Sequence, residues 1–446
     1  MNVSKKKAVQ KGYISNSDLV LLAFATAFFS RILDYLGAPS LINFFHFFAI
    51  SFICIFILYK NTVKEPMVIK KIWQLIFALF IFFTVIVISS LINHAGAVNA
   101  ILGFVLLVEP FLLLLTILAL SFTLEGLTKF RRWIMGFLFS HLLIAYSQKY
   151  LFRVDTWEHL HLEPVDRIQG VFFLSGGGHV VGASVSLTFA LYYLVTAKQS
   201  PLWLRITVAL AALWHVIISD AKQVILAFMV AWVIMFLFKL NNIVLLLQYF
   251  TAGSVFGYGF WWCTQNLEAF RAYNTWSDPE LYGPDGDATM LKTAAFRVIP
   301  THYESILNWF FGLGPGHTIG RLGGWMVHQY RELLTPLGVT IHQASFDVWA
   351  EVSKYYIGSR SSLFSPLFGW AGIWGDLGLL GLAAYLYLSW LVWHHICIED
   401  ISKFLLLTVF VFGLIFSQME EPGYMLSIAA IIGLRWQENQ IQKQLK

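Results

Sequence analysis

The chain has 446 residues, of which 58% are hydrophobic and only 12% are charged. A soluble globular domain carries about twice that share of charged residues, so the composition excludes a water-soluble globule and indicates a polytopic membrane protein with no nucleic-acid partner. The net charge of +5 is small for this length, and the three cysteines have no metal-ligand spacing and no even number for a disulfide framework.

Apolar runs of about 20 residues, the length with which a helix crosses about 30 Å of hydrocarbon, recur along the whole chain. They predict an all-α fold with about 12 transmembrane helices. The fourth run is interrupted by Glu109 and Pro110, and the last run is short. The predicted spans are 18–37, 40–59, 72–92, 98–122, 132–150, 171–197, 202–219, 221–238, 243–264, 366–392, 402–419 and 422–435.

Lysine and arginine in the short loops predict the orientation, because these residues prefer the cytoplasmic side. Basic residues precede the first span, recur in every second loop and end the chain. The protein is therefore expected in the cytoplasmic (inner) membrane, with both termini in the cytoplasm. The residues concerned are Lys5, Lys6, Lys7, Lys11, Lys60, Lys64, Lys70, Lys71, Lys129, Arg131, Arg132, Lys198, Arg205, Lys239, Lys403, Arg435, Lys443 and Lys446.

One of the opposite loops, 265–365, is far longer than the rest and is therefore expected outside the cytoplasm. Loops of this length are usually functional or disordered, and tryptophans such as Trp309, Trp325 and Trp349 favour a folded segment that buries surface. Periodicity predicts amphipathic helices at 288–311 and 322–338. Between them, the glycines of a Gly-Leu-Gly-Pro-Gly turn allow the backbone to approach a ligand or another helix closely.

Arg297, then Trp309, then this glycine turn form a pattern that resembles the O-antigen ligase and O-antigen polymerase superfamily. Three further stretches resemble family segments: "DRIQGVFFLSGGGHVVGASVSLTFALYYL" (166–194), "IISDAKQVILAF" (217–228) and "GDLGLLGLAAYL" (375–386). The second has Lys222 where the family usually has Arg, and the third has Asp376 in place of Glu. Together the matches cover about half of the chain.

The resemblance implies a metal-independent, inverting glycosyltransferase without a cofactor, whose donor is an undecaprenyl-pyrophosphate-linked glycan. Other expected partners are membrane lipids and proteins for chain-length control or export. A departing pyrophosphate needs fixed cations, and Arg297, Lys222 and Arg167 are expected at the extracytoplasmic face. Arginine suits bidentate contact with phosphate, whereas lysine supplies a point charge. The alternative for each is an interfacial or solvated charge.

The general base is where the chain departs from the family. The family generally has a His about eight residues ahead of its Glu-Leu pair, but this position is Phe368. Replacement candidates are His317, His342 and His302, with His317 preferred because it follows the glycine turn. Asp376 is the competing base, or a structural hydrogen-bond acceptor inside its span. The predicted substrate-binding residues are Arg167, Trp309, Gly314, Gly316 and His342.

The preferred function is a polymerase that joins lipid-linked repeat units into exopolysaccharide, capsule or O-antigen, because polymerases of this superfamily vary more in sequence. A ligase that transfers the glycan to lipid A-core or protein is the alternative. From other classes, a transporter of lipid-linked substrate and a non-catalytic scaffold stay open, although the chain shows no internal repeat. The predicted regions are the N-terminal helices 1–165, the superfamily-like helices 166–264, the large loop 265–365 and the C-terminal helices 366–446.

Overall fold

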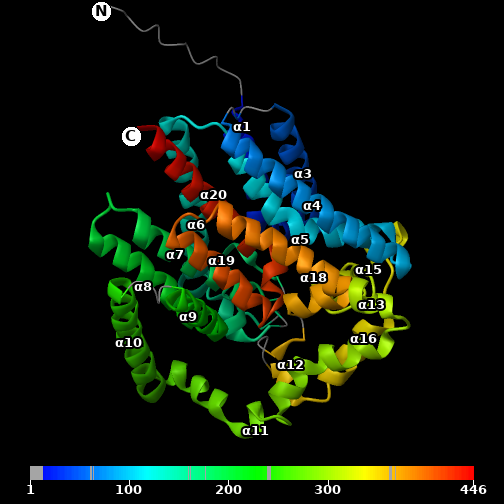
Figure 1. Ribbon diagram of the computed structural model, residues 1–446. Helices are drawn as coiled ribbons and strands as arrows, with labels where there is room; N and C mark the ends of the chain where they lie inside the picture. The colour runs from blue at the N-terminus through cyan, green and yellow to red at the C-terminus, as the bar shows by residue number, and fades with distance from the viewer. Residues whose placement is uncertain are drawn as a thin grey trace, which may run out of the picture.

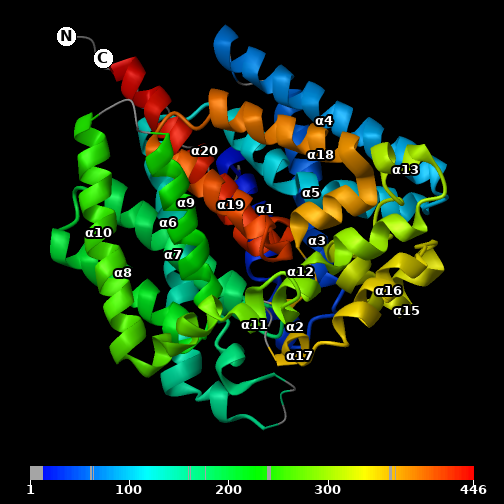
Figure 2. The same ribbon diagram turned by 60° about the horizontal axis from the view of Figure 1, so that its bottom comes forward.

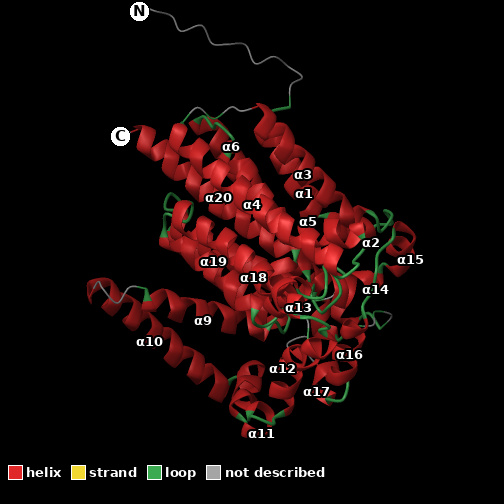
Figure 3. Ribbon diagram, turned by 45° about the vertical axis from the view of Figure 1, so that its right-hand side comes forward, coloured by secondary structure: helices red, strands yellow, loops and turns green. Residues whose placement is uncertain are grey.

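The computed structural model describes residues 14–60, 63, 65–158, 160, 162–175, 177–238, 243–360, 364–366 and 368–445. The structure is 80% helical, and no strand occurs in these ranges (Figure 3), so the all-α prediction is confirmed. Seven of the basic residues used for orientation lie outside the described residues: Lys5, Lys6, Lys7, Lys11, Lys64, Lys239 and Lys446.

Helix occupies at least part of each of the 12 predicted spans, and the chain is membrane-embedded. Six helices are long and apolar enough to cross a membrane, namely α3, α4, α5, α7, α10 and α18. The first predicted span is broken at Phe29 into α1 and α2. The helices are α1 (Asn16–Phe28), α2 (Ser30–Tyr35), α3 (Ile42–Lys60), α4 (Pro66–Ile92), α5 (Ala97–Leu118), α6 (Leu124–Tyr146), α7 (Gly178–Thr196), α8 (Leu202–Ile218), α9 (Lys222–Leu237), α10 (Ile243–Asn266), α18 (Gly369–His395), α19 (Asp400–Gly413) and α20 (Pro422–Leu445).

The interruption expected at Glu109 and Pro110 does not occur, because α5 continues through both residues. Glu109 is buried, and its Oε1 lies 2.5 Å from Nδ1 of His46 on α3. The carboxyl group therefore has a polar partner inside the bundle, where an unpaired one would be costly. In the bundle α5 packs along α20, α18 packs along α4, and α7 packs along α8 (Figure 1).

The region 265–365 folds into short helices with a core of its own. Ala288, Leu291 and Ile299 of its first half pack with Ala344 and Val348 of its second half. The helices are α11 (Pro279–Tyr282), α12 (Asp287–Val298), α13 (Ile306–Phe311), α14 (Val327–Gln329), α15 (Arg331–Leu334), α16 (Gln343–Val352) and α17 (Tyr356–Arg360). The region is thus folded, as its composition predicted.

The two amphipathic helices predicted in this region are each broken. The first ends at Val298, because Pro300 cannot continue the hydrogen-bonding pattern of an α-helix. A new helix, α13, then begins at a capping box formed by Ser305 and Asn308. The second, 322–338, consists of a π-helical turn, α14, α15 and a 3-10 turn. These breaks turn the backbone and allow the region to fold back on itself.

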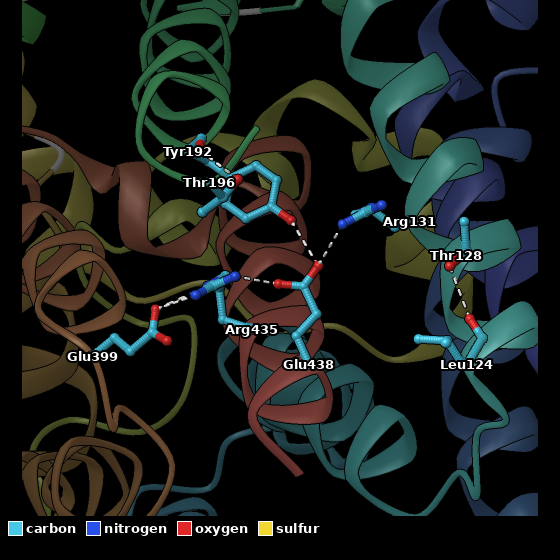
Figure 4. A network of polar contacts seen from close by, with 8 residues as sticks. All are labelled: Leu124, Thr128, Arg131, Tyr192, Thr196, Glu399, Arg435 and Glu438. Atoms are coloured by element: carbon cyan, nitrogen blue, oxygen red, sulfur yellow. Dashed lines mark hydrogen bonds and ion pairs between the residues drawn. The ribbon is translucent and has the colours of Figure 1, made fainter. Parts of the chain in front are cut away.

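A polar network ties four helices together at the end of the bundle that carries the C-terminus (Figures 1 and 4). Arg435 of α20 contacts Glu438 and donates from Nε to Glu399, just before α19, at 3.0 Å. Glu438 in turn lies 3.4 Å from Nη1 of Arg131 on α6 and 3.5 Å from the hydroxyl of Tyr192 on α7. In Figures 1 and 3 the helices α11, α12 and α16 of the long loop lie at the opposite end.

A sharp bend divides α18 at Gly378, whose φ of 65° and ψ of −163° are outside the helical region. The rings of Trp370 and Tyr385 contact each other at 5.9 Å, although a straight helix would separate these residues by about 22 Å. The bend turns the carbonyl oxygens of Gly375 and Asp376 away from the helix. They accept hydrogen bonds from the backbone N–H groups of the glycine turn, which docks the long loop on the bundle.

Replacing Gly378 by alanine should destabilise the protein strongly. Its backbone conformation is essentially restricted to glycine and costs other residues about 1–3 kcal/mol, and an added Cβ would lie 2.4 Å from the carbonyl carbon of Phe310. Thermal unfolding in detergent measures the effect. The matched control is Gly136→Ala on α6, where a Cβ meets nothing within 4 Å. Equal stability of the two variants would show that the bend is not rigid.

Candidate functional site

The glycine turn predicted from sequence lies directly on the bend of α18. Gly312, Gly314 and Gly316 have φ values of 69°, 106° and 73°, which glycine adopts without steric cost. A Cβ on Gly312 would lie 2.4 Å from the carbonyl carbon of Asp376. The N–H groups of Leu313 and Gly314 each donate over 2.9 Å, to the carbonyls of Gly375 and Asp376 respectively. The close approach made possible by the glycines is therefore to α18.

The side chain of Asp376 holds the second half of the same turn. Its Oδ1 accepts hydrogen bonds from the N–H of Thr318 at 2.8 Å and from the hydroxyl of Thr318 at 2.6 Å. Its Oδ2 accepts a hydrogen bond from the N–H of Gly316 at 2.7 Å. Three donors thus converge on this carboxylate, and this arrangement fits the structural role that the sequence left open beside that of a base.

The three candidate histidines come from separate segments of the loop and converge in the structure. The ring centroids of His317 and His342 lie 5.5 Å apart in a stacked arrangement, and those of His302 and His342 lie 5.5 Å apart edge to face. No spacing in the sequence indicated this cluster, because the fold of the loop creates it.

His317 is buried and both of its ring nitrogens are engaged. Nδ1 lies 2.8 Å from the carbonyl oxygen of Leu313, so it carries the proton, and Nε2 can accept the hydroxyl proton of Thr340 at 2.7 Å. Asn99 of α5 donates to the carbonyls of Pro315 and Thr340. Burial lowers the pKa of His317 to about 4. This histidine is therefore a neutral tether between the turn and Thr340, whose carbonyl Asn99 of the bundle binds.

His302 has the geometry of a general base. Its Nε2 lies 3.0 Å from Oδ2 of Asp347, so the carboxylate faces this side of the ring. The lone pair on Nδ1 has no hydrogen-bond partner among the described residues, which leaves it able to accept a proton. The side chain of His302 is 19% exposed and that of Asp347 is 42% exposed. Asp347 was missed by sequence reasoning, since it lies 45 residues further along the chain.

His342 is placed between the other two histidines and begins α16. Its Nδ1 accepts a hydrogen bond from the N–H of Ala344 at 3.1 Å, which caps the helix. Burial, followed by the positive charge that His302 can carry, lowers the pKa of His342. The neutral ring therefore contributes shape and a cap rather than charge.

Arg297, like His302, contacts a carboxylate of α16. Its Nη1 lies 3.3 Å from Oε1 of Glu351, and its Nη2 donates to the carbonyl of Met290 at 2.6 Å. Glu351 and Asp347 stand four residues apart on α16, so they occupy the same face one turn apart. The predicted cation and His302 thus each contact the same face of α16, and the Arg297 side chain is 39% exposed.

Aromatic rings form the wall of this site toward α18. Trp309 of α13 contacts Tyr303 at a centroid distance of 5.1 Å and Trp374 of α18 at 6.4 Å. Trp374 also contacts Phe296, which directly precedes Arg297. The Trp309 side chain is 43% exposed. An exposed indole face is a surface on which the apolar face of a sugar ring can stack.

Lys222 and Arg167 lie in a different part of the structure. In Figures 1 and 2, α9, which begins at Lys222, is on the left, whereas α13 is on the right. Lys222 pairs with Asp220. Burial, followed by the negative charge of Asp220, raises the pKa of the nearby Asp166 to about 6. Arg167 donates to backbone carbonyls, including that of Asp155 at 2.9 Å. Its guanidinium is buried in its own loop.

A second polar cluster beside the bend was also missed by the sequence analysis. Arg321 contacts the carboxylate of Glu421 and donates from its backbone N–H to Oε2 of Glu420 at 2.8 Å. All three side chains are buried. The signal available in the sequence was the pair of acidic residues between two apolar runs, which is costly inside a membrane unless paired. The cluster links the turn between α19 and α20 to the residues that follow the glycine turn.

No family model matches the chain, and no curated protein matches it. Among the described residues, no three His, Cys, Asp or Glu side chains are grouped so as to hold a metal ion. A functional assignment therefore depends on the site geometry together with the resemblance of the sequence motifs.

Acidification should reveal the tether role of His317 through stability. Between the ordinary pKa of 6.5 and the folded value of about 4, the unfolded chain binds more protons than the folded chain, so stability falls as the pH drops through this window. The loss between about pH 7 and about pH 5 should be about 2 kcal/mol. His317→Asn keeps a donor for Leu313 and removes the titration. Its unfolding temperature should fall less on acidification; equal slopes for both proteins would contradict the assignment.

Proposed function

We propose that this chain is a membrane glycosyltransferase that polymerises lipid-pyrophosphate-linked glycan repeat units. The observation that supports this function best is that Arg297 and His302 each contact a carboxylate, Glu351 and Asp347 respectively, on one face of α16. A cation for a phosphate leaving group and a base for a hydroxyl nucleophile are the two groups that such a transfer needs. His302 would supply the base that this chain lacks at Phe368, the position where the family generally has a histidine.

In the proposed reaction, an acceptor sugar hydroxyl attacks the anomeric carbon of the donor glycan. The new glycosidic C–O bond forms as the bond between the anomeric carbon and the pyrophosphate oxygen breaks, which inverts the anomeric centre. The hydroxyl proton moves to Nδ1 of His302, and Asp347 stabilises the resulting imidazolium. Lipid pyrophosphate leaves with its bonding electron pair. No metal ion or cofactor takes part.

Arg297 is the proposed partner of the leaving pyrophosphate. A guanidinium has five N–H donors, and in the structure Nη1 faces Glu351 while Nη2 faces a backbone carbonyl. The remaining donors, and those released when Glu351 is displaced, can bind phosphate oxygens in the bidentate manner that arginine favours. Lys222 and Arg167 are proposed to act at a separate position, on lipid headgroup or acceptor, because the structure places them near other carboxylates and carbonyls.

The proposed function includes an orientation of the protein in the membrane. We place 12 spans across the inner membrane, with both termini in the cytoplasm and the site outside. The basic loops support this orientation. The positions of the first helix and of the C-terminal end of α20, opposite to α12 and α16 in Figures 1 and 3, are consistent with it.

His302→Ala should lower the polymerisation rate about 10²- to 10⁴-fold, as loss of a general base does. Asp347→Asn should lower it less, because the ring keeps its base but loses its orienting charge. The measurement is glycan length in a strain that lacks the chain and is complemented with each variant at matched protein level. His394→Ala, an exposed histidine at the other end of α18, is the control.

Loss of long chains with single repeat units retained is the expected result for His302→Ala. Normal chain length in this variant would remove His302 from the mechanism. Full-length polymer accumulating on the lipid carrier in the strain without the chain would indicate a ligase instead of a polymerase.

Impermeant thiol labelling tests the orientation. In a chain with Cys54, Cys263 and Cys397 replaced by alanine, Ser353→Cys, exposed after α16, should react with a reagent applied outside intact cells. Glu125→Cys, exposed at the start of α6, should react only after permeabilisation. The reverse pattern would place the long loop in the cytoplasm and would contradict a transfer reaction on the outer face of the membrane.

A further inference from the structure

The short helix α13 of the long loop turns an apolar face outward. Ile306, Leu307 and Phe310 are 70%, 45% and 43% exposed, and their spacing places them on one side of the helix. Asn308 lies on the opposite side, where it is buried and donates from Nδ2 to Oδ1 of Asn93 at 2.8 Å. The polar residue thus faces the protein and the apolar residues face away from it, which is the reverse of a helix that borders on water.

The position of α13 is fixed by two helices of the bundle, at the end of α4 and at the bend of α18 (Figures 1 and 2). The hydroxyl of Ser89, in the last turn of α4, donates to the carbonyl of Phe311 at 2.5 Å. On α18, an added Cβ at Gly378 would lie 2.4 Å from the carbonyl carbon of Phe310. Both α4 and α18 are long and apolar enough to cross a membrane, so α13 is held directly against membrane-spanning structure.

The depth of α13 follows from the lengths of these two helices. At the other end of the bundle, Lys71 of α4 donates from Nζ to the carbonyl of His395, the last residue of α18, at 2.9 Å. At a rise of about 1.5 Å per residue, Ser89 lies about 27 Å from Lys71 along α4, and Gly378 lies about 26 Å from His395 along α18. Tilt of either helix shortens the depth that this length spans.

These lengths compare directly with the thickness of the hydrocarbon layer, which is about 30 Å. A lysine such as Lys71 keeps its ammonium group at the membrane boundary. Both helices therefore place their contacts with α13 inside the hydrocarbon layer, near its far boundary. At the same level, Leu379 and Leu380 are exposed directly after the bend of α18, so the apolar face of α13 continues the lipid-facing surface of a membrane-spanning helix.

We propose that α13 is inserted into the lipid leaflet on the side of the long loop, with Ile306, Leu307 and Phe310 among the acyl chains. In the orientation proposed above, this is the outer leaflet. The occupant of the apolar face is the bilayer itself, because the depth and the neighbouring exposed leucines are those of a lipid-facing surface. A partner protein from the aqueous phase would meet the long loop farther from the bundle.

The distribution of charge marks where the polar surface of this segment ends. Glu304 is exposed just before α13, and no Asp, Glu, Lys or Arg occurs between Glu304 and Arg321. The chain therefore passes from the headgroup region into hydrocarbon where α13 begins. His302 lies on the polar side of this boundary, so the candidate site is held at the level of the lipid phosphates. The insertion does not depend on which reaction the site carries out.

Fluorescence quenching tests the insertion in the full-length chain with Cys54, Cys263 and Cys397 replaced by alanine. The chain carries a fluorescent label at Leu307→Cys and is placed in phosphatidylcholine nanodiscs, which leave both membrane faces open to water. One quencher is phosphatidylcholine brominated on its acyl chains, and the other is iodide in solution. The label should lose most of its fluorescence with brominated lipid and little with iodide. The matched control, Ser353→Cys after α16 in the same loop, should show the opposite pattern.

A second variant tests whether the apolar face holds α13 in lipid. Ile306→Asp places a charge in hydrocarbon, which is costly, but an acidic residue in the first turn favours the helix itself. In the chain labelled at Leu307→Cys, this change should weaken quenching by brominated lipid and strengthen quenching by iodide. Its unfolding temperature in detergent should match that of the labelled parent, because the Ile306 side chain is exposed.

The proposal is overturned if iodide quenches the Leu307 label as strongly as the Ser353 label, because α13 would then face water, as a docking site for a protein does. It is also overturned if brominated lipid leaves the Leu307 label unchanged. Neither measurement contains a glycan donor. Strong quenching by brominated lipid in a chain that joins no repeat units would therefore support the insertion while the proposed polymerase function fails.

Discussion

The docking of the glycine turn on the bend of α18 is the contact on which the candidate site depends. Two backbone hydrogen bonds, from Leu313 and Gly314, end on the carbonyls of Gly375 and Asp376, and the Asp376 carboxylate receives three more from Gly316 and Thr318. These bonds exist because Gly378 interrupts the helix and releases its carbonyls. A continuous transmembrane helix would satisfy its own backbone and would offer the loop nothing to bind.

The residues proposed to act on substrate belong to the part of the long loop that this contact holds in place. Asn99 fixes the turn to α5 directly, His317 joins the turn to Thr340, which Asn99 also binds, and α12 packs on α16 through the core of the loop. Two carboxylates on α16 then orient the two groups proposed to act on substrate, Arg297 and His302. The docked turn thus forms a rigid support, and the polar side chains beyond it stay partly exposed. A transferase at a membrane surface requires both features.

The sequence was sufficient for the features that depend on local pattern. Apolar runs predicted helix at all 12 positions, and composition predicted that 265–365 is folded. It did not reveal contacts between distant segments. Nothing local shows that His302 meets Asp347, that Glu351 pairs with Arg297, or that Arg321 meets Glu420 and Glu421, because each pairing depends on how the chain folds back. Pro300 and Gly378 were visible in the sequence, but only the tertiary contacts decide how sharply the backbone turns there. Proximity to Arg297 favoured His317 as the base, yet its burial and two hydrogen bonds were not predictable from a glycine turn alone.

Reconstitution with substrate tests the central claim most directly. The purified chain is placed in liposomes with lipid-linked glycans extracted from cells that lack it, and both glycan length and free undecaprenyl pyrophosphate are followed with time. The account predicts lipid-linked glycans of increasing length, with one undecaprenyl pyrophosphate released for each repeat unit joined, in the presence of a metal chelator. Unchanged glycan length with no pyrophosphate lipid released, by a chain that is folded and correctly inserted, would contradict it.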